Sequence, residues 1–371
     1  MKDFLGEIPG QQKVKSILNA FLRSNKIPHA LLFSGIDGTG KEIIAFKFAQ
    51  SVASLKDSLN SDSIVRQIRQ LSEPHIKYII PLPRGKGETD STSPTEKLSS
   101  DEMDLVREQL SLKIKNPFHK VSLPKANNIK ISSIRDIKKF LSLDYSEIAH
   151  RFIVISDAHL MNEEAQNALL KNLEEPPENV IFILCTSQVS KLRHTIISRC
   201  WRINFDPLSE GDIAEILKKF FNIDQKMIEA VTPFANGSIQ IALQLINMDV
   251  INLKEKTISV LRYAFGRKFN SAFEELNNVL GDKGIQNYPI VVKMMITWLN
   301  DLLKHRYNLK QFFFNDYRET LEKFNSKFPK ADLNNISIKL DNLASLTGRN
   351  INLNLLSANL IFELSSVTSK G

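Results

Sequence analysis

Hydrophobic and polar residues in the first fifty positions follow two different spacings. Residues 12–21 carry apolar side chains three and four positions apart, which predicts an amphipathic helix. Residues 30–33 are all apolar and stop at Ser34-Gly35, as a buried parallel strand does. A second helix is expected over 42–51.

The same alternation returns after residue 130. The pattern predicts, in order, a helix at 131–141, a strand at 152–155, a helix begun by an Asn162 cap and ending near 175, and a strand at 180–184. Strands and helices that alternate in this way predict a parallel sheet with helices on both faces. After Pro207 the strand pattern disappears, and the rest of the chain is expected to be helical.

Residues 84–127, the insertion, interrupt this order. Residues 84–94 are polar and without periodicity, which predicts a loop that we expect to be mobile. A charged helix is expected over about 100–112. The pattern assigns the insertion no function.

Length and composition define the class of protein. A chain of 371 residues with 42% hydrophobic residues predicts two or three folded domains and argues against disorder. The expected division is an α/β domain at 1–206, a small helical lid at 207–249 and an all-α domain at 250–371. The net charge of +8 suits work near nucleic acid, and it is equally ordinary for a soluble protein.

Several classes of site are not expected. Two cysteines, Cys185 and Cys200, cannot form a disulfide framework or a four-cysteine zinc site, and we interpret both as buried thiols. The histidines show no ligand spacing, so no metal site is expected. No basic head precedes an apolar run at the start, and no apolar stretch reaches about 18 residues, so we expect a cytoplasmic protein without a membrane partner.

The segment after the first predicted strand carries candidate chemistry. Gly35, Gly38, Gly40 and Lys41 fit the phosphate-binding P-loop, in which glycines let backbone N–H groups surround a phosphate and the lysine reaches the β- and γ-phosphates. The next residue should be Ser or Thr, whose hydroxyl holds Mg²⁺, but it is Glu42. An ordinary glycine-rich turn is the alternative interpretation.

The second nucleotide motif should be an apolar strand that ends in two acidic residues. The strand at 152–155 is followed by Ser156, Asp157 and Ala158. Either Ser156 replaces the metal-binding Asp, or Asp157 is that residue and Ala158 replaces the Glu that orients water. One carboxylate is missing in both registers, so the sequence predicts a second defect in the same site.

Two longer motifs point to a family. Residues 167–177 read Asn-Ala-Leu-Leu-Lys-Asn-Leu-Glu-Glu-Pro-Pro, and Ser198-Arg199-Cys200 follows downstream. Together with the opening segment at Gly10-Gln11 and 27–30, these residues resemble the AAA+ subunits of the bacterial DNA polymerase III clamp loader. The resemblance implies an AAA+ P-loop fold with a helical lid and a collar domain, and a sensor-1 polar residue at Thr186 or Ser187.

Within that family, the sequence is most similar to the delta-prime type, which lacks a working ATP site. Gln240 stands where motor subunits place an arginine. The resemblance implies that Arg199 serves a neighbour's ATP site, while Asp157 and Thr186 are the remaining candidates for nucleotide contact. It implies other clamp-loader subunits, the sliding clamp and primed DNA as partners. No cofactor is required, although residual ATP binding is possible.

Two alternatives stay open at this point. The chain could be an ATP-hydrolysing motor subunit of the gamma or tau type, or a degenerate AAA+ protein of another DNA-processing complex. The sequence also departs from the family, since residues 51–80 lack the cysteines of the zinc module that many clamp-loader subunits carry.

Overall fold

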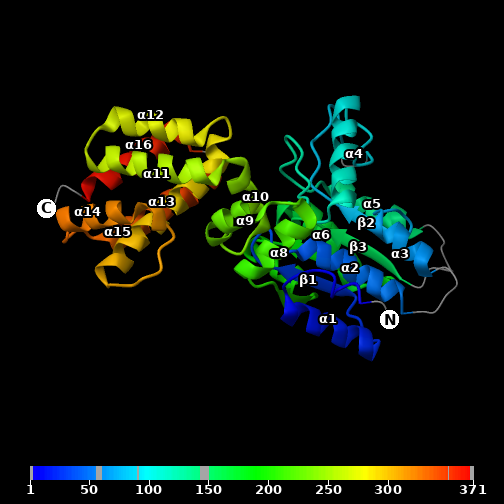
Figure 1. Cartoon of the computed structure of the whole chain (residues 1–371). Helices are drawn as coiled ribbons and strands as arrows, with labels where there is room; N and C mark the ends of the chain where they lie inside the picture. The colour runs from blue at the N-terminus through cyan, green and yellow to red at the C-terminus, as the bar shows by residue number, and fades with distance from the viewer. Residues whose placement is uncertain (1–2, 56–60, 90–91, 143–149, 350, 368–371) are drawn as a thin grey trace. The chain divides into compact units, whose positions relative to one another are not determined.

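The computed structural model describes residues 3–55, 61–89, 92–142, 150–349 and 351–367, and it divides into two compact units (Figure 1). The first unit comprises Met1–Ile228 with Asn236–Gln240, and the second comprises Glu229–Ala235 with Ile241–Gly371. The division into three domains at residues 206 and 249 stays a prediction.

The first unit alternates strands with helices. Its elements are α1 (Gln12–Ser24), β1 (Ala30–Ser34), α2 (Lys41–Ala53), α3 (Ser61–Arg69), β2 (Ile76–Ile79), α4 (Ser100–Lys115), α5 (Ile131–Ser142), β3 (Arg151–Ile155), η1 (Ala158–Leu160), α6 (Glu163–Glu174), β4 (Val180–Thr186), η2 (Val189–Lys191), α7 (His194–Ile197), β5 (Trp201–Asn204) and α8 (Glu210–Phe221). The strands form one parallel sheet in the order β2-β3-β4-β1-β5. The predicted α/β class is confirmed, whereas β2 and β5 were not predicted.

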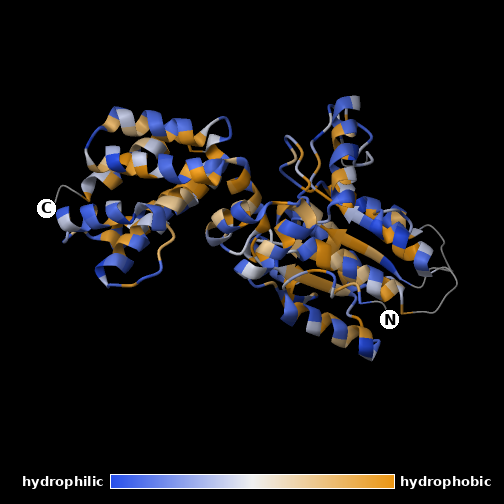
Figure 2. Ribbon diagram, in the orientation of Figure 1, coloured by the Kyte–Doolittle hydropathy of each residue, from blue (hydrophilic) through white to orange (hydrophobic). Residues whose placement is uncertain are grey.

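The sheet is buried on both faces, and its central strands are apolar except at the end residues Ser34, Arg151 and Thr186. Leu32, Phe182 and Leu184 pack on one face with side chains from α5 and α6. On the opposite face, Leu31 and Phe33 are equally buried, and α2 contacts β3 and β4. Figure 2 shows these strands as nearly continuous hydrophobic segments.

The strand register brings three loops to one edge of the sheet. Ser34 at the end of β1 lies opposite Thr186 at the end of β4, and Ile155 at the end of β3 lies opposite Leu184. Because all strands are parallel, the segments that follow β1, β3 and β4 meet at the carboxyl edge, where ligands bind in open α/β sheets.

The insertion builds its own small structure beside the sheet. Helix α4 begins with a capping box in which Ser99 and Glu102 bond reciprocally, and it projects away from the other helices in Figure 1. Val106 of α4 packs against Ile80 and Leu82 in a separate apolar cluster. The expected loop at 84–94 forms turns where the structure describes it, and residues 90–91 of that loop lie outside the described residues.

The second unit is helical, as predicted. Its elements are α9 (Gln225–Val231, which begins in the first unit), η3 (Thr232–Phe234), α10 (Ile239–Asn247, likewise shared), α11 (Val250–Phe265), α12 (Phe269–Leu280), α13 (Gly284–Arg306), η4 (Asn315–Tyr317), α14 (Arg318–Lys327), α15 (Leu333–Ser345), η5 (Leu346–Arg349) and α16 (Leu353–Ser366). Trp298 and Phe314 are buried in its core, whereas Phe313 is partly exposed. Across the part of the chain that the structure describes, no helix has the length and apolarity to span a membrane.

Candidate functional site

The glycine-rich turn between β1 and α2 has the backbone of a phosphate-binding loop. Gly38 and Gly40 have φ values of 81° and 88°, in the left-handed region that L side chains rarely adopt. A Cβ on Gly38 would also lie 2.2 Å from Oε1 of Gln240. Glycine is therefore required at Gly38 by both conformation and space.

Lys41, the first residue of α2, is folded back onto its own loop. Its Nζ donates hydrogen bonds of 2.7 Å to the carbonyl oxygens of Gly35 and Ile36. Burial lowers the pKa of Lys41, and the carboxylate of Asp37, 3.9 Å away, opposes that shift. The ammonium is thus held by carbonyl groups of its own loop.

The Glu42 carboxylate is surrounded by donors. It forms an ion pair with Lys113 from the insertion, accepts a hydrogen bond from Ser156, and accepts one of 3.0 Å from the Tyr78 hydroxyl. Burial by itself would raise the pKa of Glu42, but the Lys113 ammonium and these hydrogen bonds hold it below its usual value. Glu42 is therefore an anion whose charge is already neutralised inside the protein.

The contact between Glu42 and Ser156 bears on the two registers of the second motif. In an active P-loop site, a hydroxyl after the lysine and a carboxylate after the second strand hold Mg²⁺ together. Here the carboxylate follows Lys41 and the hydroxyl follows β3. This arrangement favours the register in which Ser156 stands at the position of the metal-binding Asp.

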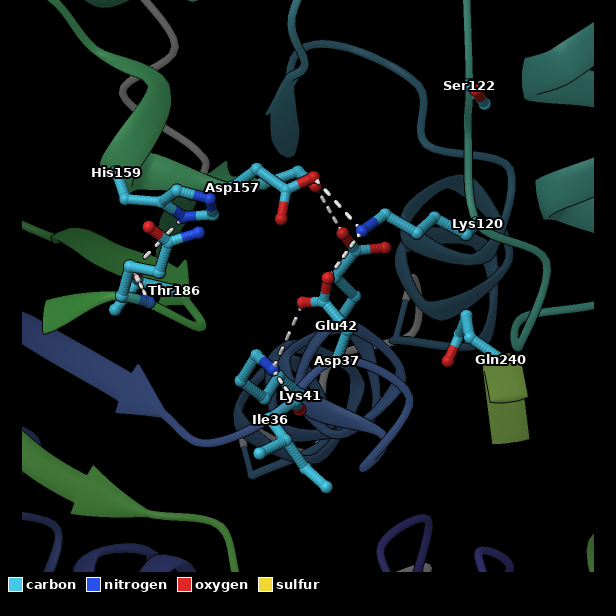
Figure 3. A network of polar contacts seen from close by, with 12 residues as sticks. Ile36, Asp37, Lys41, Glu42, Lys120, Ser122, Asp157, His159, Thr186 and Gln240 are labelled. Atoms are coloured by element: carbon cyan, nitrogen blue, oxygen red, sulfur yellow. Dashed lines mark hydrogen bonds and ion pairs between the residues drawn. The ribbon is translucent and has the colours of Figure 1, made fainter. Parts of the chain in front are cut away.

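Asp157 and Asp37 share a second lysine from the insertion. Figure 3 shows Lys120 between them, with its Nζ 2.9 Å from Asp37 and 3.7 Å from Asp157. Burial lowers the pKa of Lys120, but the two carboxylates more than reverse this and raise it. Burial also raises the pKa of Asp157, against the attraction of Lys120.

The remaining space at this edge is small. The cavity measures about 50 Å³, whereas pockets for small ligands have roughly 300–1,000 Å³. Residues from the P-loop line one side of it, and residues from the insertion, including Pro117 and Phe118, line the other. In the described ranges, no group of three or more His, Cys, Asp or Glu residues could hold a metal ion.

Comparison with known proteins decides the family. A family model described as "DNA polymerase III, delta subunit" matches residues 10–209, which is more than half of the chain. A second model, for the C-terminal part of the DNA polymerase III delta subunit, matches residues 242–366. The chain belongs to this clamp-loader AAA+ family.

Individual relatives agree with that membership. The tau subunit of DNA polymerase III from Bacillus subtilis is 26% identical over 326 residues, covering 81% of this chain and 50% of the relative. A gamma subunit from Buchnera aphidicola is 29% identical over 255 residues, covering 66% of this chain and 59% of the relative. The chain thus spans little more than half the length of these curated relatives.

Among solved structures, a DNA polymerase III gamma subunit-related protein from Thermotoga maritima matches 95% of this chain and 99% of its own. Its sequence identity is 15% and the TM-score is 0.42.

Only some of the site residues predicted from the sequence lie at the cavity. Gly38, Gly40, Lys41 and Asp157 line it, and the Gly35 carbonyl holds Lys41. Thr186 is fully buried and is not among the lining residues.

Thr186 instead belongs to a buried pair beside the cavity. Its Oγ1 lies 3.2 Å from Nδ1 of His159 and accepts a hydrogen bond of 3.1 Å from the Gln188 backbone (Figure 3).

Neighbouring Cys185 lines the cavity, and burial raises the pKa of its thiol. Cys200 is half-buried, and burial raises its pKa to about 12, so both cysteines stay protonated at neutral pH.

Arg199 lies just beyond α7 and is not among the residues that line the cavity. Its Nη2 is 2.8 Å from Oε1 of Glu174, and its Nη1 donates a hydrogen bond of 3.0 Å to the Thr195 carbonyl. Its side chain is 35% exposed.

Sequence reasoning did not identify Tyr78, Lys113 or Lys120 as part of the site. Tyr78 belongs to β2, a four-residue strand that the pattern did not reveal. The two lysines belong to a polar insertion in which lysines are common, so their spacing gave no signal. Their role depends on a contact between segments about 70 to 80 residues apart along the chain.

Proposed function

We propose that this chain is a non-hydrolysing, delta-prime-like subunit of the clamp loader, which helps to place the sliding clamp on primed DNA in the cytoplasm. The observation that carries the proposal is the environment of Glu42. Hydrolysis needs Mg²⁺ bound between a P-loop hydroxyl and a carboxylate. The Lys113 ammonium contacts the Glu42 carboxylate at that position instead.

The proposal gives Arg199 a role in another subunit. A guanidinium can stabilise the charge that develops on a transferred phosphoryl group, and such arginine fingers can act across a subunit boundary. The partial exposure of Arg199 and its position in the Ser-Arg-Cys motif support this role. Its bonds to Glu174 and Thr195 would fix the direction of the side chain.

The proposal also gives the second unit a role in assembly. Clamp-loader subunits act as hetero-oligomers, and the family resemblance assigns residues 250–371 to a collar that joins the subunits. The helical core around Trp298 supports a unit with its own stability. The other subunits, the clamp and primed DNA are the partners that follow from this assignment.

The main alternative is an ATP-hydrolysing motor subunit. It is favoured by the similarity to tau and gamma subunits at 26–29% identity. A motor of this kind would have to bind Mg²⁺ without a P-loop hydroxyl. The two functions therefore make opposite predictions for the purified chain.

Steady-state ATP hydrolysis by the purified full chain separates these functions. We expect no turnover above background at any Mg²⁺ concentration, and no difference between the wild type and Lys41→Ala. ATP binding without turnover would be compatible with the proposal. Magnesium-dependent turnover that Lys41→Ala abolishes would instead establish the motor function.

A further inference from the structure

One segment of the insertion, residues 113–120, lies directly across the P-loop. Lys113 reaches Glu42, and Lys120 reaches Asp37 and Asp157. Figure 3 shows Lys120 pointing from the insertion into the acidic side of the site. These contacts join the insertion to the loops after both β1 and β3.

An aromatic residue of the same segment fills the space beside the glycines. A Cβ on Gly40 would lie 3.7 Å from a ring atom of Phe118, so this ring is in van der Waals reach of the P-loop backbone. The Phe118 ring also packs edge-to-face against Phe220 of α8, with ring centroids 4.9 Å apart. Phe118 is buried between the two.

The segment is held in place by several independent bonds. The Asn116 amide donates to the Phe220 carbonyl at 3.0 Å, and the Gln240 amide donates to the Phe118 carbonyl at 3.4 Å. Lys113 also donates to the His119 carbonyl at 2.8 Å, which closes the segment on itself. Hydrogen bonds to α8, to Gln240 and within the segment itself therefore fix its position.

The charges of the segment match those of the site. Glu42, Asp37 and Asp157 would repel one another and any phosphate group if they were left without cations. Lys113 has a side chain only 3% exposed, so its charge is placed inside the protein and not in solvent. Burying an ammonium is costly unless it is paired, and here each lysine is paired with a carboxylate.

We infer that residues 113–120 are an intramolecular occupant of the nucleotide pocket. Phe118 takes the volume beside the P-loop, and the Lys113 and Lys120 ammonium groups supply the positive charge that Mg²⁺ would bring to these carboxylates. The inference deepens the proposed non-hydrolysing function, on which it rests, and it assigns the insertion a role. It differs from a simple motif defect because restoring the P-loop residue would not open the site.

The experiment compares repair of the motif with removal of the occupant. One variant, Glu42→Thr with Lys113→Met, restores the P-loop hydroxyl and removes the charged pair together. A second variant adds Phe118→Ala and Lys120→Ala. A matched control adds Leu112→Ala and Lys125→Ala to the first variant, because these residues belong to the insertion but do not line the cavity. Fluorescent ATP with Mg²⁺ is the probe, in full-length protein.

We expect no measurable binding by the wild type, the repaired variant or the control. The variant without the occupant should bind with a Kd at least tenfold below the highest ATP concentration at which the repaired variant shows no binding, a difference of at least about 1.4 kcal/mol. Lys41→Ala in that background should abolish binding. Equal binding by the repaired variant and the variant without the occupant would overturn the inference. Absence of ATP binding by the variant without the occupant, when circular dichroism shows that it is folded, would overturn it as well.

Hydrogen exchange of the wild-type protein gives a second test that needs no substitution. Millimolar Mg-ATP should leave the exchange rates of residues 35–43 and 113–120 unchanged, because the occupant excludes the nucleotide. Protection of residues 35–43 by ATP would overturn the inference. If that protection occurred without turnover, the proposed non-hydrolysing function would still stand, so the two failures are distinguishable.

Discussion

At the scale of single residues, an active P-loop site has a hydroxyl after the lysine and a carboxylate after the second strand. Here the two groups are exchanged, because Glu42 follows the lysine and Ser156 follows β3. The exchange keeps their mutual hydrogen bond. It also moves the negative charge next to Lys41, where the phosphates would lie, so that a cation other than Mg²⁺ must balance it. Lys113 is that cation.

The Glu42–Lys113 pair should stabilise the fold only as a unit. Lys113→Met leaves a largely buried carboxylate, 18% exposed, without its cation, and should lower the free energy of unfolding by about 3 kcal/mol. Adding Glu42→Thr removes the stranded charge and should restore most of that loss. Urea denaturation of both single variants and the double variant gives the coupling energy. Single-variant costs that simply add would show that the two side chains do not interact.

His159 should make stability depend on pH in mildly acidic solution. Burial, together with the nearby Lys191 and Lys120 ammonium groups, lowers its pKa to about 4, and the Asp37 carboxylate opposes this shift. An unfolded histidine has a pKa near 6.5. Between these values the unfolded state binds a proton that the folded state does not, so the free energy of unfolding should fall as pH drops from about 6.5 to 4.

His159→Gln should reduce this fall by about 2 kcal/mol, because glutamine can still bond Thr186 but does not titrate. Urea denaturation at several pH values measures the slope. Burial also lowers the pKa values of His75 and His119, so some slope should remain. His194→Gln, at an exposed position, is the control and should leave the slope unchanged. Identical slopes for wild type and His159→Gln would exclude His159 as the source.

At the scale of elements, the strands that were predicted are those with long apolar runs, β1, β3 and β4. They lie in the centre of the sheet, where both faces are buried and apolar side chains are favoured. The two missed strands, β2 and β5, are its edges. β2 has Lys77 in its middle, which pairs with Glu73 and Asp136 at 2.6 Å, and that polar residue hid the strand from pattern reading.

Helix α16 divides its leucines between the core and the surface. Leu356, Leu360 and Leu364 are buried within the second unit, so this stripe stabilises the unit itself. Leu355 and Phe362 are each 57% exposed, and Phe362 stacks on Phe269 of α12 with ring centroids 5.3 Å apart. We propose these two exposed apolar side chains as a contact between the predicted collar and another subunit.

Leu355→Ser with Phe362→Ser should weaken assembly of the complex at least tenfold without unfolding the chain, because both side chains are largely exposed in the isolated protein. Size-exclusion chromatography of the reconstituted complex measures assembly, and thermal melting checks the fold. Tyr307→Ser removes an exposed aromatic residue outside α12 and α16 and serves as the control. Normal assembly by the double variant would argue against these side chains as the collar contact.

At the scale of the whole molecule, the chain's own site and its proposed action are separate. The cavity beside the P-loop is this chain's own candidate nucleotide site, and Arg199 is not among the residues that line it. A subunit without turnover can therefore still affect ATP hydrolysis in a complex. Arg199 can be altered without touching the P-loop.

Arg199→Ala should leave the complex assembled and lower the turnover of the neighbouring ATP site by roughly 10³-fold, the lower end of the effect of arginine fingers. Arg199→Lys should rescue poorly, because an ammonium lacks the planar fork of donors. ATP turnover by the reconstituted complex, with assembly checked by size-exclusion chromatography, measures both. Arg193→Ala, an exposed arginine beside α7, is the control. Unchanged turnover in an assembled Arg199→Ala complex would leave the chain a scaffold only.

The sequence by itself determined the α/β class, the helical C-terminal region, the P-loop with its missing hydroxyl, and the family. These features depend on residues close together in the chain, where periodicity and motif spacing are visible. Only the tertiary structure decided that Ser156 contacts Glu42, that Thr186 contacts His159, and that residues of the insertion line the cavity. Those outcomes depend on which distant segments meet at the carboxyl edge of the sheet. The local sequence pattern does not predict contacts between distant segments, because a lysine in a polar loop has the same sequence context whether it faces solvent or a buried carboxylate.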